Sequence, residues 1–446
     1  MPIHIYPAAA LVVFVAYLAS KNDYLKNWPA RRKEKAPLVQ KRRIVHVTGN
    51  SSYIISVDVL SPSNELAWTE GPMLVEHTNF RHLLFTDTEL DRIYKYTEPI
   101  DENQSSRALA AATWMEIAGG LKDEGERKKL QEPGANGLVI HPSQKTFLIF
   151  QHGSRQIVQA STAWLEKEKL TIEATNTVVA SYKGKRFHSP NDGVFTKDGS
   201  VLFFTDPPYG LRDNGTNLTD QEFLNTLPTR ELDFQGVYVL PILNDADVTW
   251  NNQQVQLLAT LPRPNGIALS SDESVLFVSN SGYSDPLKAK ESLKTVSGAF
   301  IMAYTLIYES VEIEIKSDAS ENFHDLSKTR NILMPTKAIN PQKIIDFSSN
   351  ENYLVSGPGS TDGIKIDPKT NRLYVSGPGG VFIFDIDILT GSGEQKEVKA
   401  THIESYITKT AIGNVVLGNC GDIYICASQD VIRVRHDHGL LYRNDK

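Results

Sequence analysis

The sequence predicts an all-β fold, a six-bladed β-propeller with a hydrophobic N-terminal segment, on three observations. Short apolar or alternating runs are separated by turns rich in Gly, Asp, Asn and Pro, and no amphipathic helix of convincing length interrupts them. One sequence phrase recurs six times along the chain. Each repeat predicts a small antiparallel sheet, which cannot bury both faces alone but does so when about four to eight such sheets stack radially.

The repeated phrase is a polar residue before Gly, followed by a strand, a turn and a second strand. It is clearest over residues 189–210, where Asp198-Gly199 separates two apolar runs and predicts a hairpin. The six copies begin at Glu70-Gly71, Asn136-Gly137, Asn191-Asp192-Gly193, Asn265-Gly266, Asp362-Gly363 and, more weakly, Gly413. Each copy is therefore expected to form one blade.

The copies are unevenly spaced, and the additional residues fall into two insertions, 211–234 and 282–345. Both insertions are polar and are expected to be rich in loops, and the longer one is a candidate lid over the site. Residues 53–60 alternate between apolar and polar side chains as a half-buried strand does. We expect this strand to close the ring by pairing with the last blade.

The composition is that of an ordinary globular protein and gives no support to nucleic-acid binding. The 446 residues are 40% hydrophobic and 22% charged, with a net charge of -7. The two cysteines, Cys420 and Cys426, fit either a disulfide or two free thiols. The chain lacks CxxC, HExxH, P-loop, G-x-G-x-x-G and G-x-S-x-G motifs, which argues against zinc sites, nucleotide cradles and α/β-hydrolase serine chemistry.

The N-terminus divides into an apolar segment and a basic one. Residues 5–19 are nearly all apolar, which is shorter than the roughly 20 residues of a spanning helix and close to a signal-peptide core. Basic residues follow this segment rather than precede it, which by the positive-inside rule would hold the downstream side in the cytosol, whereas a secreted protein needs the opposite orientation. We predict a signal peptide or membrane anchor over 1–20, a polar tether over 21–50 and the propeller over 51–440. The expected location is the secretory pathway, extracellular or membrane-anchored.

The residue before each repeated Gly should lie near the propeller axis. Pseudo-rotational symmetry puts equivalent residues at one radius and height, so these positions form a ring of Glu70, Asn136, Asn191 with Asp192, Asn265 and Asp362, with Ile412 in the sixth place. Oxygen-only donors suit Ca²⁺ or Mg²⁺, and an amide-rich set favours Ca²⁺. The alternative is that all are turn residues chosen for backbone reasons. Glu70 does not fit that alternative, because Glu is a poor turn residue.

These motifs resemble the SMP-30/gluconolactonase family of six-bladed propeller lactonases and, more distantly, diisopropyl-fluorophosphatase and the paraoxonases. The resemblance covers about residues 60–435. Its motifs are Glu70-Gly71-Pro72, Ser189-Pro190-Asn191-Asp192-Gly193, Phe204-Thr205-Asp206-Pro207-Pro208-Tyr209-Gly210, Pro264-Asn265-Gly266 and Asp362-Gly363-Ile364.

The resemblance implies which residues form the site. The family's divalent-metal ligands fall on Glu70, Asn265 and Asp362, and Asn191 is a ligand in some relatives and a substrate contact in others. Asn136 and His152 are further candidate substrate contacts. His152 belongs to a phrase similar to the family's His-Gly-x-Arg, and it either faces the pocket or is a satisfied histidine at a strand end. Phe187, His188 and Tyr209 flank the same loops as pocket walls or as packing residues.

The function implied is a metal-dependent hydrolase of cyclic esters, a gluconolactonase-like lactonase acting on a small-molecule lactone or ester. The cofactor implied is Ca²⁺, with Mg²⁺, Mn²⁺ and Zn²⁺ as alternatives. Asp362 would be the general base on a bound water, and direct nucleophilic attack by Asp362 is the variant mechanism. The alternative functions are a phosphotriesterase- or arylesterase-like hydrolase and a non-catalytic calcium-stabilised binding propeller. A strictosidine-synthase-like condensing enzyme is disfavoured by the intact set of four ligands.

Overall fold

The chain divides into two units, Met1–Pro37 and Leu38–Lys446. A computed structural model describes residues of the second unit only, namely 40–49, 51–60, 66–76, 80–99, 113–166, 175–213, 229–244, 249–250, 254–284, 296–315, 328–348, 359–391, 395–419 and 421–435. The predicted signal peptide or anchor, 1–20, lies outside these residues and stays a prediction. Within the described ranges, no helix is long and apolar enough to cross a membrane.

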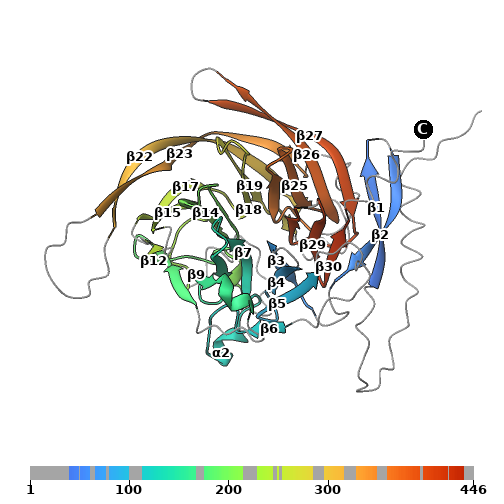
Figure 1. The fold of residues 1–446 in the computed structure, drawn as a ribbon, viewed down its shortest axis with the longest axis horizontal. Helices are drawn as coiled ribbons and strands as arrows, with labels where there is room; N and C mark the ends of the chain where they lie inside the picture. The colour runs from blue at the N-terminus through green and yellow to red at the C-terminus, as the bar shows by residue number, and fades with distance from the viewer. Residues whose placement is uncertain are drawn as a thin grey trace, which may run out of the picture. The chain divides into compact units, whose positions relative to one another are not determined.

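The described residues form six groups of antiparallel strands that follow one another around a centre, as the colour sequence in Figure 1 shows. The last two groups are joined edge to edge into one nine-stranded sheet. We number the six groups as blades 1 to 6. Blade 1 contains β3 (Thr69–Glu76), β4 (Phe80–Asp87), β5 (Arg92–Pro99) and β6 (Thr113–Glu116). Blade 2 contains β7 (Ala135–Ile140), β8 (Thr146–Gln151), β9 (Gln156–Ser161) and β10 (Asn176–Val179). Blade 3 contains β13 (Gly193–Phe195), β14 (Val201–Asp206), β15 (Gly236–Asn244), β16 (Thr249–Trp250) and β17 (Gln256–Thr260).

The second half of the ring has the same plan with longer outer strands. Blade 4 contains β18 (Pro264–Leu269), β19 (Val275–Asn280), β22 (Phe300–Ile315) and β23 (Lys328–Asp346). Blade 5 contains β24 (Ile364–Asp367), β25 (Arg372–Gly377), β26 (Gly380–Thr390) and β27 (Lys396–Ile407). Blade 6 contains β28 (Asn414–Leu417), β29 (Ile423–Ala427), β30 (Asp430–Val434) and, from the other end of the chain, β2 (Ser51–Val59). The predicted repeat is confirmed, because each phrase begins the first strand of one blade.

Short elements connect or flank the blades. They are α2 (Glu124–Arg127), the 3-10 helices η2 (Thr162–Glu166) and η4 (Tyr209–Leu211), and the two-residue strands β11 (Ser181–Tyr182), β12 (Lys185–Arg186), β20 (Tyr283–Ser284) and β21 (Val296–Ser297). The predicted hairpin around Asp198-Gly199 is present between β13 and β14, with Gly199 at a φ of +73°. That backbone conformation suits glycine.

The hydrophobic core lies between the blades. Each of six buried clusters joins two neighbouring sheets; the cluster between blades 1 and 2, for example, contains Met73 and Leu84 from one sheet and Leu138 and Phe147 from the next. The last of these interfaces brings Phe85 of blade 1 against the second strand of blade 6. The apolar faces of each blade are thus buried only by its neighbours, which is the reason that radial stacking was expected.

The ring closes with a strand from the N-terminal side, as predicted for residues 53–60. In β2, Asp58 pairs with Arg433 and Val59 with Ile432 of β30. The expected polar tether over 21–50 is wrong in its last part, because β1 (Gln40–Thr48) is a strand that pairs with β2 and with β27 of blade 5. The basic residues of β1 obscured a strand pattern in which alternate side chains, those of Ile44 and His46, are buried.

The longer insertion contains far more regular structure than expected. Residues 300–315 and 328–346, predicted to be loop-rich, are the long hairpin β22–β23. The charged and polar residues of 309–315 and 328–331 made the insertion look polar, although 300–308 are an apolar run typical of a buried strand. Tyr308, Val311, Ile332 and Met334 of the hairpin pack with Val237 and Val239 of blade 3. The hairpin thus packs against the outer strands of blade 3 (Figure 1) rather than against its inner strands.

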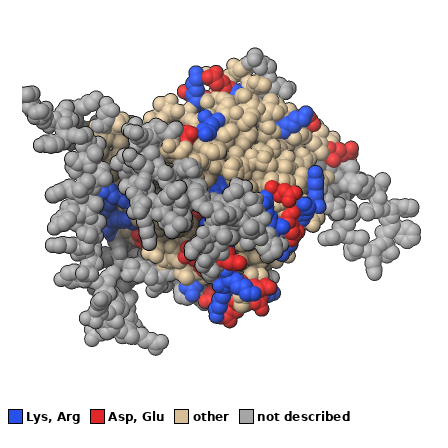
Figure 2. Space-filling view, turned by 180° about the vertical axis from the view of Figure 1, so that it is seen from behind, with Lys and Arg blue, Asp and Glu red and all other residues tan. Residues whose placement is uncertain are grey.

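Charged side chains of both signs are interspersed over the face shown in Figure 2. The described part of this face carries no extended basic patch, and the net charge of -7 likewise gives no support to nucleic-acid binding. Cys426 is a free, buried thiol, and Cys420 lies outside the described residues.

Candidate functional site

Backbone contacts between neighbouring blades place the repeated phrase at the centre of the ring. The amide of Gly137 donates a hydrogen bond to the carbonyl oxygen of Asn191, at 2.8 Å. A Cβ on Gly137 would lie 2.4 Å from that same oxygen, so only glycine lets blade 2 approach blade 3 this closely. The same close approach occurs where the ring closes, between blades 6 and 1. A Cβ on Gly413 would lie 2.6 Å from the carbonyl oxygen of Thr69.

Hydroxyl groups on the second strand of a blade hold the phrase of the following blade. Each hydroxyl donates to the main-chain oxygen of the polar residue before the next repeated Gly. The pairs are Thr86 with Asn136 at 2.8 Å, Thr205 with Asn265 at 2.6 Å and Ser279 with Asp362 at 2.6 Å. These bonds fix the backbone from which the candidate site side chains project.

Glu70 supplies a buried carboxylate with one unsatisfied oxygen. Its side chain is almost fully buried, and Oε1 accepts a hydrogen bond from the indole nitrogen of Trp68 at 3.1 Å. Oε2 is buried and has no hydrogen-bond partner among the described residues. Burial raises the pKa of Glu70, and the carboxylates of Glu132 and Asp192 raise it further.

Asp362 is a second carboxylate at the same place. Burial raises the pKa of Asp362 well above its usual range, and the nearby carboxylates of Glu70 and Glu132 add to the shift, while a hydrogen bond from Asn265 opposes it. The amide nitrogen of Asn265 also lies 3.0 Å from the Ser281 hydroxyl. Glu70, Asn265 and Asp362, predicted from three separate blades, are therefore brought together, with two carboxylates that repel each other.

The amide side chains of Asn136 and Asn191 add two more buried oxygens. Both residues are almost fully buried, and the Oδ1 atom of each has no hydrogen-bond partner among the described residues. A buried acceptor without a donor is costly, so each such oxygen needs a ligand or water as its partner. The predicted ring thus holds three unsatisfied oxygens, those of Glu70, Asn136 and Asn191.

His152 reaches the site through Asn191. Its Nε2 lies 3.5 Å from the amide nitrogen of Asn191, and its Nδ1 lies 3.1 Å from Oε2 of Glu132. His152 is fully buried. Glu132 was not singled out from the sequence, because it lies before β7 and outside the repeated phrase, where no periodic signal marks it.

Asp192 makes a link across the centre that the sequence did not indicate. Its Oδ2 accepts a hydrogen bond from Nζ of Lys365 at 2.8 Å and another from the amide of Asn414 at 3.3 Å. Asn414 occupies the sixth position of the ring, and the expectation that Ile412 does so is wrong. Ile412 packs in the core between blades 5 and 6, and the polar residue in this copy follows the repeated Gly instead of preceding it.

The three flanking residues differ in role. Phe187 is fully buried and stacks edge-on against Phe204 and Tyr238, so it is a packing residue. Burial lowers the pKa of the His188 side chain to about 4, and its Nε2 lies 3.0 Å from the main-chain oxygen of Leu232. Tyr209 belongs to the site, because its hydroxyl hydrogen-bonds Ser281 and Asn265 and burial and the Asp362 charge raise its pKa.

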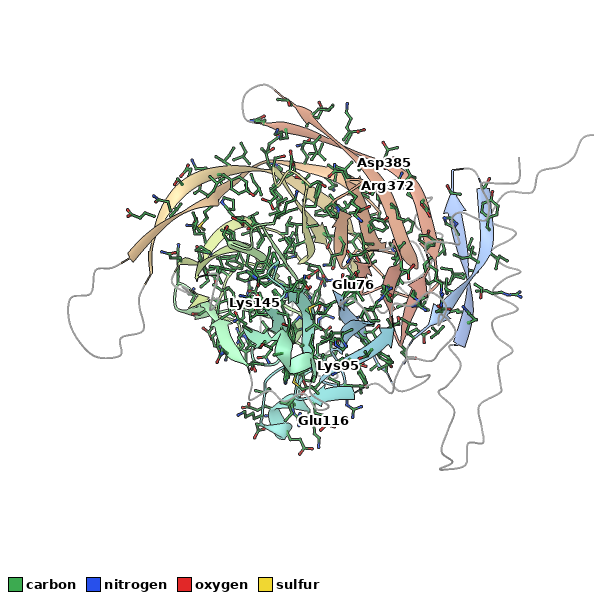
Figure 3. All side chains as sticks on the ribbon, in the orientation of Figure 1. Glu76, Lys95, Glu116, Lys145, Arg372 and Asp385 are labelled. Atoms are coloured by element: carbon green, nitrogen blue, oxygen red, sulfur yellow. The ribbon has the colours of Figure 1, made fainter. Side chains whose placement is uncertain are left out.

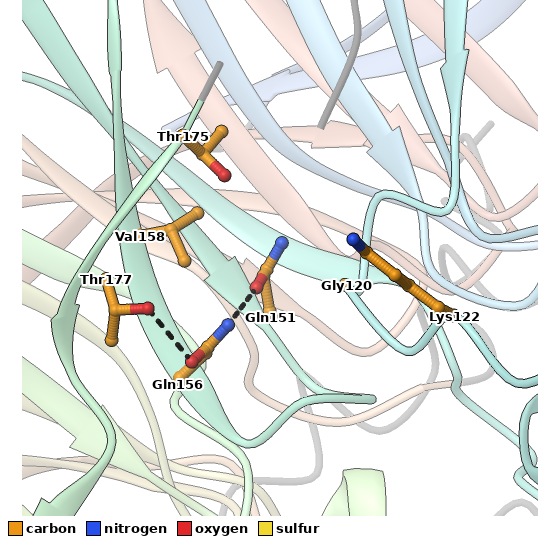
Figure 4. A pocket seen from close by; sticks show the side chains of 7 residues that line it. All are labelled: Gly120, Lys122, Gln151, Gln156, Val158, Thr175 and Thr177. Atoms are coloured by element: carbon orange, nitrogen blue, oxygen red, sulfur yellow. Dashed lines mark hydrogen bonds between the residues drawn. The ribbon is translucent and has the colours of Figure 1, made fainter. Parts of the chain in front are cut away.

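A separate polar cavity of about 390 Å³ lies at the edge of blade 2, as Figure 4 shows. It is lined by Gln151 and Gln156, joined by a 2.8 Å hydrogen bond, and by Thr177, Lys122 and Gly120 among others. None of the predicted site residues lines it. This cavity is therefore distinct from the centre of the ring.

About half of the chain is similar to a known protein family. Residues 68–289 match the model described as the SMP-30/Gluconolactonase/LRE-like region. This match places residues 68–289 in the SMP-30/gluconolactonase family. The matched region includes Glu70, Asn136, His152, Asn191 and Asn265, and Asp362 lies beyond it.

Two family-related proteins extend the comparison over most of the chain. A curated gluconolactonase of Zymomonas mobilis subsp. mobilis is 29% identical over 390 residues, which cover 85% of this chain and 82% of the relative. The solved structure of a gluconolactonase from Xanthomonas campestris superposes with a TM-score of 0.52 at 19% identity, covering 91% of this chain and 99% of that one. The structural likeness supports the propeller fold.

Proposed function

We propose that this protein hydrolyses cyclic esters at a divalent cation held in the centre of the ring. The observation that carries the proposal is the convergence of Glu70, Asn191, Asn265 and Asp362 from four blades, with two repelling carboxylates and unsatisfied buried oxygens between them. The sequence relationship to a gluconolactonase over 85% of the chain supports lactones as the substrate class.

The residues present fit a hard cation. All the candidate donors are carboxylate or amide oxygens, and within the described ranges no three His, Cys, Asp or Glu side chains form a metal-binding group by themselves. The candidate donors therefore form a mixed carboxylate and amide set, which favours Ca²⁺ over softer metals. Such a cation would relieve the repulsion between Glu70 and Asp362 and satisfy the free oxygens. When bound, it would polarise the lactone carbonyl and stabilise the developing oxyanion.

The chain's own residues would supply proton transfer and orientation. The Asp362 carboxylate would accept a proton from water as the water oxygen bonds to the carbonyl carbon. The ring C–O bond then breaks, and the leaving ring oxygen takes up a proton to give the open hydroxy acid. The Tyr209 hydroxyl, which stays protonated because its pKa is raised, would be a donor beside Asp362. Asn136 and Asn191 would orient the substrate or complete the cation's ligands.

The test is a substrate panel with a matched pair of variants. Aldonolactones, aliphatic lactones, aryl esters and phosphotriesters are assayed with EDTA and with added Ca²⁺, Mg²⁺, Mn²⁺ or Zn²⁺. We expect lactone hydrolysis that EDTA abolishes and a cation restores. Asp362→Asn should retain the fold and lose about 10²–10⁴-fold in kcat, since it removes the general base.

Asp387→Asn is the control, because Asp387 is an exposed residue of β26. It should leave kcat unchanged. Cation binding without turnover of any lactone would contradict the proposal and favour a binding propeller. Turnover of phosphotriesters or aryl esters alone would favour the other hydrolase class.

A further inference from the structure

The carboxamide of Asn191 is held from one side only. Its nitrogen lies 3.5 Å from Nε2 of His152, whereas its oxygen, although buried, has no partner among the described residues. The amide nitrogen can only donate a hydrogen bond, so this contact requires that Nε2 of His152 carries no proton. The orientation of the Asn191 amide therefore depends on the tautomer of His152.

Glu132 selects that tautomer. Its Oε2 lies 3.1 Å from Nδ1 of His152, and an ionised carboxylate can only accept. A proton on Nδ1 satisfies this carboxylate and, in a neutral ring, leaves Nε2 as the acceptor that the amide nitrogen of Asn191 requires. If the Asn191 amide were flipped, its oxygen would face the lone pair of Nε2, and two acceptors would repel each other. The hydrogen-bond chain consequently directs the Asn191 oxygen toward the centre of the ring.

The imidazole is held firmly enough to act in this way. His152 is fully buried, and its amide donates to the main-chain oxygen of Gly134 at 3.0 Å. A Cβ on Gly210 would lie 2.8 Å from Cβ of His152, so the loop carrying Tyr209 and Gly210 packs directly on the histidine. Both ring nitrogens are directed at protein groups, Glu132 and Asn191, so the contribution assigned to the ring is orientation rather than proton transfer to substrate.

We propose that Glu132 and His152 form a positioning pair that fixes the Asn191 carboxamide with its oxygen toward the site and thereby raises the cation affinity. Partners that orient a ligand from behind commonly change metal affinity by about 10–100-fold when they are removed. The inference rests on the proposed function in that Asn191 is taken as a ligand of the cation.

The experiment is a calorimetric titration of the full chain with CaCl₂. Glu132→Gln keeps the side-chain shape but can donate to Nδ1, which permits the other tautomer and the flipped amide. His152→Phe keeps a ring and removes both hydrogen bonds. Each variant should bind Ca²⁺ about 10–100-fold more weakly than the unaltered chain. The double variant should lose no more than His152→Phe alone, because the two residues act as one unit.

His188→Phe is the matched control, since His188 is also fully buried but its Nε2 contacts the main-chain oxygen of Leu232 and not a proposed ligand of the cation. Its Ca²⁺ affinity should be unchanged, and thermal unfolding in EDTA reports any general loss of stability in all variants. Absence of Ca²⁺ binding by the unaltered chain would overturn the proposed function itself. Normal binding by the unaltered chain together with equal binding by Glu132→Gln, or additive losses in the double variant, would overturn the positioning pair alone.

Discussion

The axis of the propeller and its outer edge obey different constraints. Near the axis, the repeated Gly contacts a main-chain oxygen of the next blade in blades 1, 2, 4, 5 and 6, so the same arrangement recurs around most of the ring. At the outer edge, the strands vary from 2 residues in β16 to 19 in β23, so the outer strands tolerate large changes in length. The outer edge also carries the ring closure by β2.

This difference separates function from stability. A residue at the axis is in contact with two neighbouring blades, so its side chain can meet those of other blades and form a shared site. A residue in an outer strand contacts one or two neighbouring strands, and it contributes chiefly to packing and to the closure of the ring. We therefore expect substitutions at the outer edge to change the free energy of unfolding without changing cation affinity, and substitutions at the axis to change cation affinity.

The largest expected effect on stability is at Asp58, which joins β2 to β30. Asp58 is almost fully buried and hydrogen-bonds Lys41, Arg433 and Arg435, with the Arg433 contact at 2.7 Å. Asp58→Asn should lower the free energy of unfolding at pH 7 by about 3 kcal/mol, because it leaves buried positive charge uncompensated. Urea denaturation measures this loss, and calcium titration should show unchanged affinity.

The pH dependence of that loss follows from the pKa of Asp58. Burial alone would raise this pKa, but the hydrogen bonds from Lys41, Arg433 and Arg435 lower it from 3.8 to about 2. The folded-state pKa is therefore below the unfolded one, so the contribution is present above about pH 4 and is lost as the pH falls toward 2. The difference between Asp58→Asn and the unaltered chain should shrink over the same range.

An exposed ion pair on blade 5 is the control for Asp58. Arg372 and Asp385 are labelled in Figure 3. Nε of Arg372 lies 2.9 Å from Oδ1 of Asp385, and the two side chains are 40% and 47% exposed. Asp385→Asn should cost less than about 1 kcal/mol, since solvent screens exposed pairs. Equal losses in the two variants would contradict the role assigned to Asp58 in closing the ring.

A smaller loss of unfolding free energy is expected from substituting the glycines at the two ends of β28, Gly413 and Gly418. A Cβ on Gly413 would lie 2.5 Å from Oε1 of Glu70, whereas a Cβ on Gly418 meets no atom nearer than 3.5 Å. Gly413→Ala should cost about 1–3 kcal/mol of unfolding free energy and weaken Ca²⁺ binding by at least about 10-fold, because Glu70 must move. Gly418→Ala should change stability by less than about 0.5 kcal/mol and leave Ca²⁺ binding intact. If both variants bind Ca²⁺ as the unaltered chain does, the axis is not the cation site.

Much of the axis could be predicted from the sequence, because its constraint is repeated. The phrase before each Gly marked Glu70, Asn265 and Asp362 as neighbours although they are far apart in the chain, and the structure brings them together. The strand at 53–60 was also predicted, since its alternation is clear and an open ring would leave an unpaired edge.

Residues outside the repeat could not be predicted in the same way. Glu132 contacts His152 within blade 2 and Lys365 contacts Asp192 of another blade, and no periodicity marks either residue. Asn414 is displaced by one position within its phrase. The strand β1 and the hairpin β22–β23 were missed because charged side chains on their exposed faces made these segments look like linkers. Their strand character depends on neighbouring blades that only the folded chain provides.

The most direct test of the central claim is a crystal structure of the full chain grown with CaCl₂, with the cation located by its anomalous signal. We predict one peak at the centre of the ring, bound by oxygens of Glu70, Asn265 and Asp362, with the Asn191 oxygen directed at it. A centre without a cation peak, in which the carboxylates of Glu70 and Asp362 hydrogen-bond to each other or point apart, would contradict the account.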